Sequence, residues 1–247
     1  MVIIYQLTNL TTEFCKHVSP HRRRQHSGTN YTVELQSRAI RGLFTTIRDE
    51  NCPRDVYNTN CDRLCNILAE EGLALLPNVI ESKVVKTPTG DTYDGLEVPD
   101  VKKHLCAVSI VRSGDILLEA VRRVAVGVAV GKILLQRDEE DEHKRPKLYY
   151  SKLPKDVSER TIMLVDPMLA TGGSANLAIK VLLDAGVKEK NILFLVVVAA
   201  PEGIENVHAK HPDVRIVAAE IDKGLNEDKY IVPGLGDFGD RYYGTED

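Results

Sequence analysis

The 247-residue sequence contains no tryptophan, and aromatic residues make up only 5% of it. It has no apolar run of the roughly 18–20 residues that a helix needs to cross a bilayer, so we expect no membrane partner. Basic residues are not in excess, because 32 Lys and Arg stand against 36 Asp and Glu. This balance disfavours a nucleic-acid partner, since such binding requires many side chains that neutralise phosphates.

The cysteines are odd in number and form no C-x-x-C pair; they are Cys15, Cys52, Cys61, Cys65 and Cys106. This pattern argues against a disulfide framework and against a structural zinc site. We therefore expect free thiols in a reducing, cytoplasmic compartment. Hydrophobic residues make up 43% of the chain, which is enough for a sizeable core.

The first 30 residues differ from the rest and include the basic run from His21 to His26. We expect residues 1–30 to form a solvated or loosely packed arm. The alternative is that they are a targeting segment. Glu13 and the lack of a clear amphipathic stripe weaken the interpretation as a transit peptide. Residues 31–247 are expected to form a single domain.

After residue 100, short apolar runs alternate with helical patterns. Strands are expected at 105–111, 132–135, 162–165, 192–199 and 214–218, and helices at 116–124, 173–185 and 202–210. Helical patterns also cover 33–49 and 64–75, and 82–100 is typical of a hairpin or an irregular connection. The alternation predicts an α/β fold with a mostly parallel sheet, in which ligands bind beyond the carboxyl ends of the strands.

The most informative stretch runs from Asp166 to Ser174 and follows an apolar strand pattern. Its two glycines allow backbone N–H groups to surround an anion where the next helix begins. Thr171 and Ser174 add hydroxyl donors, and Asp166 can accept hydrogen bonds from two sugar hydroxyls. This order suits a ribose 5-phosphate, whereas the missing P-loop lysine disfavours a triphosphate. The alternative is an ordinary helix N-cap behind an acid at a strand end.

Three further features carry possible chemistry. The strand at 105–111 leads into Arg112-Ser113-Gly114, a combination suited to a diphosphate, and the alternative is an arginine at a strand end that pairs with a surface acid. Arg137 precedes the charged run 138–145, which is typical of a solvated loop. The segment from Ile231 to Thr245 is rich in glycine, and a plain surface loop is the alternative interpretation for it.

Three of these segments, Val108–Gly114, Asp166–Ser174 and Ile231–Thr245, resemble motifs of the uracil phosphoribosyltransferases. The resemblance covers roughly residues 33–247 in the family's order. It implies a type I phosphoribosyltransferase fold with a flexible hood hairpin at about 138–153 and a uracil-recognition segment at about 225–247. The implied reaction converts uracil and 5-phosphoribosyl-1-diphosphate (PRPP) to UMP and diphosphate, with Mg²⁺ bound mainly through the substrate diphosphate.

The resemblance also implies a role for individual residues. The implied PRPP-binding residues are Arg112, Ser113, Gly114, Arg137, Asp166, Pro167, Met168, Leu169, Ala170, Thr171, Gly172, Gly173, Ser174 and Asp237. The implied uracil-binding residues are Ile231, Gly236, Asp237 and Phe238. Arg137, Asp166 and Asp237 are the expected catalytic residues, and no side chain is assigned as a direct metal ligand.

Some members of this family are activated by GTP and assemble as homodimers or homotetramers, so the resemblance raises both expectations. Arg54, Arg63 and Arg160 fall where basic residues of the GTP site would lie, although Ala129 stands where another would be expected. Surface or salt-bridged arginines are the alternative.

The same fold allows two alternative functions. An RNA-binding regulator is disfavoured by the net charge of −4, by the lack of a basic aromatic patch and by the three intact motifs. A transferase acting on a purine base is disfavoured by the Gly236–Asp240 sequence.

Overall fold

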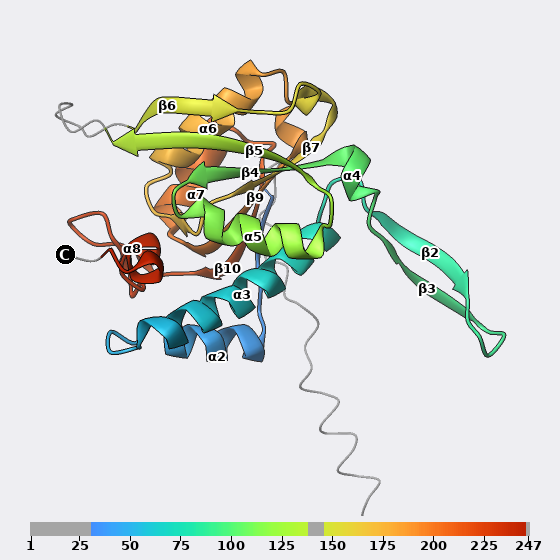
Figure 1. Cartoon of the computed structure of the whole chain (residues 1–247), viewed down its shortest axis with the longest axis horizontal. Coiled ribbons are helices and arrows are strands. Elements are labelled where there is room, and N and C mark those ends of the chain that lie inside the picture. Colours follow the sequence, from blue (N-terminus) through green and yellow to red (C-terminus); the bar gives the residue numbers. More distant parts are fainter. Residues whose placement is uncertain (1–30, 138–145, 246–247) are drawn as a thin grey trace, which may run out of the picture.

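The computed structural model describes residues 31–137 and 146–245. They form a central sheet with the strand order β1-β10-β9-β7-β4-β5-β6, and β8 also pairs with β9 (Figure 1). In that order the strands are β1 (Tyr31–Glu34), β10 (Arg215–Ile221), β9 (Ile192–Ala199), β7 (Thr161–Val165), β4 (Leu105–Val111), β5 (Ala129–Arg137) and β6 (Pro146–Lys152), with β8 at Met168–Leu169. Every pairing is parallel except that of β5 with β6.

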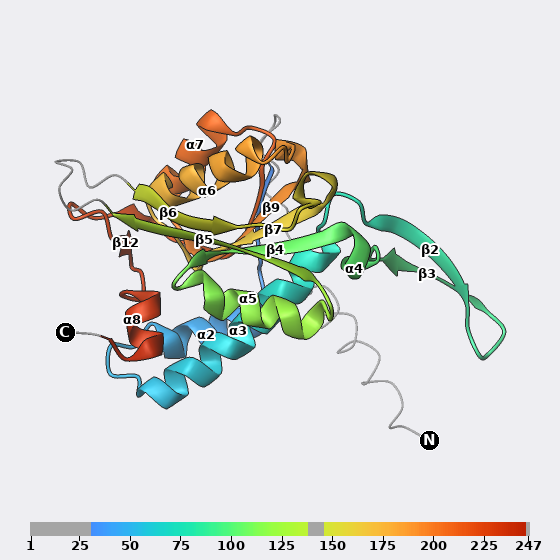
Figure 2. The ribbon, with the colours of Figure 1, turned by 45° about the horizontal axis from the view of Figure 1, so that its top comes forward.

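Helices cover both faces of this sheet (Figure 2). One face carries α2 (Arg38–Ile47), α3 (Arg54–Ala74) and α5 (Gly114–Val124), and the other carries α6 (Gly173–Asp184) and α7 (Pro201–Lys210). The shorter elements are α4 (Val101–His104), α8 (Phe238–Tyr243), the pair β11 (Gly224–Leu225) and β12 (Ile231–Val232), and the 3-10 turns at Val157–Glu159 and Glu189–Asn191. The predicted α/β fold with a mostly parallel sheet is confirmed.

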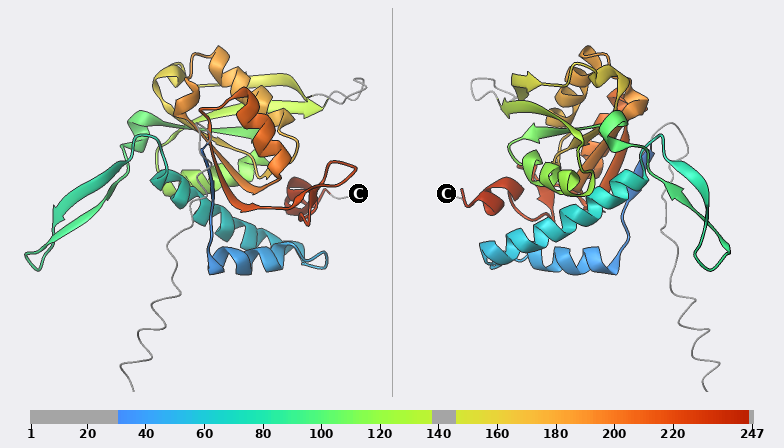
Figure 3. Two further views of the ribbon diagram at one scale, coloured as in Figure 1. Left: turned by 180° about the vertical axis from the view of Figure 1, so that it is seen from behind. Right: turned by 45° about the vertical axis from the view of Figure 1, so that its right-hand side comes forward.

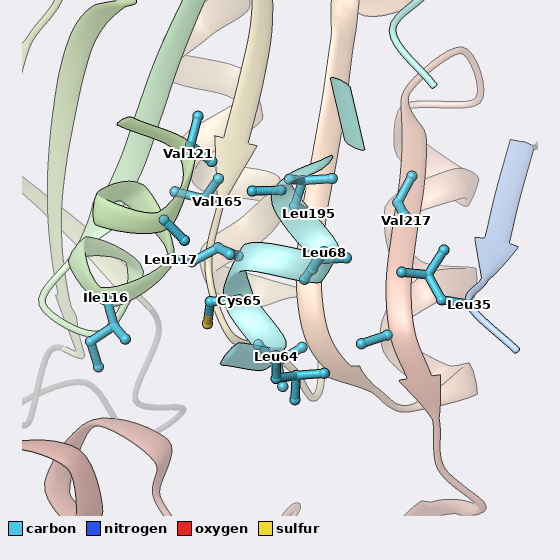
Figure 4. Close-up of a cluster of buried hydrophobic side chains, with 14 of the residues drawn as sticks. Leu35, Leu64, Cys65, Leu68, Ile116, Leu117, Val121, Val165, Leu195 and Val217 are labelled. Atoms are coloured by element: carbon cyan, nitrogen blue, oxygen red, sulfur yellow. The ribbon is translucent and has the colours of Figure 1, made fainter. Parts of the chain in front are cut away.

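The alternation of side chains along β9 explains why its sequence is apolar throughout. Leu193 and Leu195 face the α2/α3/α5 side, whereas Phe194 and Val196 face the α6/α7 side, and all four are fully buried. Figure 4 shows the first of these layers, where Leu68 of α3 and Leu117 of α5 pack near Leu195. A strand buried on both faces needs a continuous apolar run, which is why 192–199 and 105–111 are predicted with their observed bounds.

Several elements differ from the expectations. β5 spans Ala129–Arg137 instead of 132–135, and α3 begins at Arg54, well before the predicted 64–75. The helix predicted over 33–49 begins only at Arg38, where Ser37 caps it, because the preceding residues form β1 and pair with β10. α8 has no counterpart among the expected elements, and β6 is expected only within the hood hairpin that the resemblance implies. β6 is the antiparallel partner of β5 in the expected hood hairpin, whose residues 138–145 lie outside the described ranges.

A hairpin of β2 (Ile80–Lys86) and β3 (Thr92–Glu97) extends away from the sheet in both views of Figure 3, which confirms the hairpin alternative for 82–100. The four cysteines within the described ranges are free thiols, as expected, and Cys15 lies outside those ranges. Among the described residues, no helix is long and apolar enough to span a membrane.

Candidate active site

Two of the predicted anion-binding loops meet at the carboxyl edge of the sheet. One follows β4 and begins with Arg112 and Ser113, and the other follows β7 and begins with Asp166. The two loops touch directly, because the Ser113 hydroxyl donates a hydrogen bond to Oδ1 of Asp166 at 3.2 Å. Since β4 and β7 are parallel neighbours, their register brings these residues together.

Gly114 makes this close approach possible. A Cβ at this position would lie 2.6 Å from the carbonyl oxygen of Val165, the residue just before Asp166. A side chain here would therefore push the loop after β4 away from the loop after β7. The requirement for glycine comes from this packing, because Gly114 is the first residue of α5 and needs no special backbone angle.

The Asp166 carboxyl is destabilised as an anion. Burial is the main cause that raises its pKa to about 7, and the nearby charge of Asp237 contributes in the same direction. The hydrogen bonds from Ser113 and from the Met168 N–H lower the pKa but do not offset the burial. Near neutral pH this carboxyl is therefore poised to ionise when hydrogen-bond donors such as sugar hydroxyls reach it.

The loop from Asp166 to Ser174 is fixed against β9. The Pro167 carbonyl accepts from the N–H groups of Val197 and Val198 at 2.9 and 3.0 Å, and Met168 and Leu169 form β8 beside β9. The Leu169 side chain is buried. Pro167, Met168 and Leu169 thus brace the loop, and Ala170–Ser174 follow them at the N-terminus of α6.

Helix α7 supports the same loop from behind, through residues that sequence reasoning missed. The Asn206 amide donates to the Thr171 carbonyl at 2.7 Å. A Cβ at Gly203 would lie 2.9 Å from the Leu169 carbonyl oxygen. Gly172, at φ +80°, forms the left-handed N-cap of α6 in front of Gly173 and Ser174. No sequence pattern links α7 to this loop.

The third predicted motif reaches the first through α8. Asp237 caps this helix by accepting from the Asp240 N–H at 2.8 Å. Asp240 forms an ion pair with Arg112 and accepts from the Thr245 hydroxyl, and these contacts lower the pKa of the Asp240 carboxyl. The Arg112 guanidinium also lies 5.3 Å from the centre of the Tyr243 ring. The C-terminal segment is therefore attached to the loop after β4.

The four predicted uracil-binding residues lie in one segment and differ in exposure. Ile231 and Phe238 are buried, and the Phe238 ring packs edge-on against Tyr57 of α3 at 5.9 Å between centroids. Gly236 and Asp237 are exposed, so their main chain and carboxylate are accessible to a ligand.

Arg137 ends β5 opposite Pro146 of β6. Pro146 in turn lies 3.7 Å from the position that a Cβ of Gly173 would occupy. The β5/β6 hairpin therefore borders the loop that leads into α6. The rest of the predicted hood, residues 138–145, lies outside the described ranges.

The three arginines predicted for a GTP site lie in different places. Arg54 begins α3 beside Gly244, and Arg63 donates to Asn60 on the surface of the same helix. Arg160 lies just before β7, at the end of the strands opposite the candidate site. There it donates to the Lys102 carbonyl and pairs with Asp156 at 2.7 Å. GTP binding stays a prediction.

The carboxylates of the site fit a magnesium ion that arrives with its substrate. Mg²⁺ prefers oxygen ligands and is usually bound by one or two carboxylates together with substrate phosphates and water. Asp166 and Asp237 supply two such carboxylates, close enough for one to raise the pKa of the other. In the parts of the chain that the structure describes, no group of three or more His, Cys, Asp or Glu side chains could hold a resident metal.

Comparison with known proteins identifies related sequences. A family model described as uracil phosphoribosyltransferase matches residues 34–245. The uracil phosphoribosyltransferase of Dictyostelium discoideum is 47% identical over 218 residues, which cover 88% of this chain and 98% of that protein. The Saccharomyces cerevisiae enzyme of the same name is 48% identical over 208 residues, which cover 84% and 93%.

Two solved structures are similar in fold. The AQ2163 protein of Aquifex aeolicus is 30% identical, with a TM-score of 0.72 over 87% of this chain and 99% of that one. The adenine phosphoribosyl transferase of Trypanosoma brucei is 10% identical, with a TM-score of 0.51 over 83% and 88%. The second similarity concerns the fold alone.

Proposed function

This chain belongs to the uracil phosphoribosyltransferase family, and we propose that the residues at the carboxyl edge of its sheet carry out the family's reaction. The enzyme converts uracil and PRPP to UMP and diphosphate. The single observation that best supports the placement of this reaction is the hydrogen bond between Ser113 and Asp166, which joins two of the three motifs.

PRPP binding is assigned to the loops after β4 and β7. The hydroxyls and N–H groups of Thr171–Ser174 hold the 5-phosphate at the N-terminus of α6. Asp166 accepts hydrogen bonds from the ribose hydroxyls. Arg112 leaves its ion pair with Asp240 to bind the diphosphate, and Arg137 provides a second positive charge from the end of β5.

Uracil recognition is assigned to the main chain of Ile231 and of Gly236–Phe238. Uracil presents one N–H donor between two carbonyl acceptors, and a glycine-rich main chain can supply both kinds of partner. Cytosine exchanges a donor and an acceptor at this edge. Mismatched polar partners in a buried site can lower kcat/KM for the wrong substrate by roughly 10⁴-fold or more, so we expect cytosine to be rejected.

The reaction breaks the bond between C1 of the ribosyl group and the diphosphate oxygen, and it forms a bond from C1 to N1 of uracil. The N1 proton passes to the departing diphosphate or to water. The protein contributes by positioning the reactants and by stabilising charge. Arg112 and Arg137 stabilise the negative charge of the departing diphosphate. Mg²⁺, held by substrate oxygens with Asp166 and Asp237 nearby, supplies further positive charge there when bound.

The test of this function is UMP formation from radiolabelled uracil, measured by chromatography with purified protein, PRPP and Mg²⁺. We expect product only when PRPP is present.

Asp237→Ala should lower kcat/KM by on the order of 100-fold, because it removes a charge from the site and the N-cap of α8. Folded wild-type protein that makes no UMP would refute the proposed function. Added GTP tests activation in the same assay, and sedimentation velocity tests for a homodimer or homotetramer.

A second prediction concerns the support that α7 gives to the phosphate loop. Replacement of Asn206 by leucine removes the hydrogen bond to the Thr171 carbonyl, a loss of about 1 kcal/mol. We expect the Kd for PRPP, measured by calorimetry, to rise roughly fivefold. Asn60→Leu is the matched control, since the Asn60 amide also donates to a main-chain carbonyl, that of Val56 in α3. Equal effects of the two substitutions would contradict the assignment.

A further inference from the structure

A buried ion pair holds the main chain of Gly234 within the uracil-recognition segment. Arg48, the C-cap residue of α2, donates through both terminal nitrogens to Asp222, at 2.9 and 2.6 Å. The Arg48 side chain is 16% exposed and that of Asp222 is 2% exposed. Both also bind the main chain of Gly234, because Arg48 donates to its carbonyl at 2.6 Å and Asp222 accepts from its N–H at 2.9 Å.

A second arginine makes the reciprocal connection from α8. Arg241 donates to the Leu235 carbonyl at 2.6 Å, and to the carbonyls of Ile47 and Asp49 at 2.6 and 2.8 Å. Ile47 and Asp49 flank Arg48, so Arg241 also satisfies carbonyls at the C-terminus of α2. Its guanidinium lies 4.3 Å from the centre of the Tyr57 ring. We call Arg48, Asp222 and Arg241 the arginine clamp.

The clamp acts on main chain that is already tightly constrained. Gly234 adopts φ +64°, and a Cβ there would collide with the Ile231 carbonyl. The clamp then fixes the carbonyls of Gly234 and Leu235, the residues immediately before Gly236. A main chain that reads a base cannot adjust by changing rotamers, so its position must be set by groups outside it.

The phosphate-binding loop is held by elements other than those that carry the arginine clamp. The loop from Asp166 to Ser174 bonds to β9 and α7, whereas the clamp residues bond to α2, to each other and to Gly234–Leu235. These two stretches of main chain therefore have different side-chain supports, although Asp240 of α8 also joins the C-terminal segment to Arg112 of the loop after β4. A change in one support should affect one substrate much more than the other.

We propose that the arginine clamp positions the main chain that recognises uracil, so Arg48, Asp222 and Arg241 are positioning residues for the base and not for PRPP. This inference rests on the proposed function, which assigns uracil to Ile231 and Gly236–Phe238. It extends the uracil site to residues on α2 and at the end of β10, which do not belong to any of the three motifs.

The test compares three clamp variants in the UMP assay, with the Kd for PRPP measured by calorimetry. Asp222→Asn removes one charge, whereas Arg48→Met combined with Asp222→Asn removes both charges of the buried pair. The double substitution leaves Glu220, which is 38% exposed and lies 3.5 Å from Arg48, without this partner. Arg241→Lys keeps the positive charge but loses the planar fork. We expect KM for uracil to rise at least about tenfold in each, with Kd for PRPP unchanged within about twofold.

Asp184→Asn is the matched control, because it breaks the exposed Lys180–Asp184 ion pair on α6 and should change neither constant. If folded protein carrying the double substitution has the wild-type KM for uracil, the inference is wrong. It is also wrong if Kd for PRPP rises as much as KM for uracil in the Arg241→Lys variant, because the clamp then acts on the whole site. A wild-type protein that makes no UMP would instead refute the proposed function itself.

Discussion

Replacing Gly114 by alanine is expected to lower kcat/KM for UMP formation by about 100-fold. The added methyl group would lie 2.6 Å from the Val165 carbonyl oxygen, well inside van der Waals contact, and this oxygen belongs to the backbone and cannot rotate away. The loop after β4 must then move away from Asp166, and displacements of about 1 Å at a reacting centre can cost 100-fold in rate. Initial rates over a matrix of uracil and PRPP concentrations measure this effect.

Gly42→Ala is the control for this substitution. Gly42 lies in the middle of α2, is exposed, and has open space where its Cβ would be. Alanine is therefore expected to stabilise the protein by roughly 0.5–1 kcal/mol through helix propensity and to leave the rate unchanged. If Gly114→Ala behaved in the same way as Gly42→Ala, the packing of the two loops described here would be incorrect.

The second large effect is expected for Asp166→Asn, which should lower kcat/KM by roughly 100- to 1,000-fold while stabilising the ligand-free protein. Asparagine is neutral, so it accepts weaker hydrogen bonds from the ribose hydroxyls and does not stabilise positive charge in the site. It still accepts the hydrogen bond from Ser113, and it removes the cost of burying an ionised carboxylate. The two effects have opposite signs because the buried carboxylate promotes the reaction but destabilises the folded protein.

The stabilisation by Asp166→Asn depends on pH in a defined way. The pKa of Asp166 is raised to about 7 in the folded chain, whereas an unfolded aspartate titrates near 4. The folded state therefore disfavours ionisation, and the cost grows as pH rises from about 4 to about 7 and is constant above that. Three pKa units correspond to about 4 kcal/mol, and the partial exposure of Asp166 reduces this to roughly 1–2 kcal/mol.

Thermal unfolding at pH 5 and pH 8 measures this dependence. We expect the advantage of Asp166→Asn over the wild type to be larger at pH 8. An advantage that is the same at both pH values, or larger at pH 5, would show that burial does not raise the pKa of this carboxyl.

The sequence predicts those elements whose pattern follows from burial alone. β4 and β9 are apolar on both faces, and each is predicted with its observed bounds. β1 is missed because its apolar residues continue the helical period of α2, and only pairing with β10 makes it a strand. β6 is exposed along most of its length and is held by β5 on one side, so its sequence carries no burial signal.

The same division applies to the site. Residues that would touch substrate occur in continuous motifs, because each loop follows directly from one strand. Asn206, Arg48 and Arg241 support those loops from distant parts of the chain by bonding to main-chain carbonyls, and any residue type can provide such a carbonyl. The one available signal was Asp237, a good N-cap residue that could have indicated the short helix α8.

The most direct test of the site assignment is a crystal structure of the protein with UMP, diphosphate and Mg²⁺. We expect the 5′-phosphate of UMP at Thr171–Ser174, the ribose hydroxyls on Asp166, and the base on the main chain of Ile231 and Gly236–Phe238. Arg112 should contact the diphosphate, free of Asp240. A phosphate bound elsewhere, or a base that does not contact the C-terminal segment, would show that these residues are not the active site.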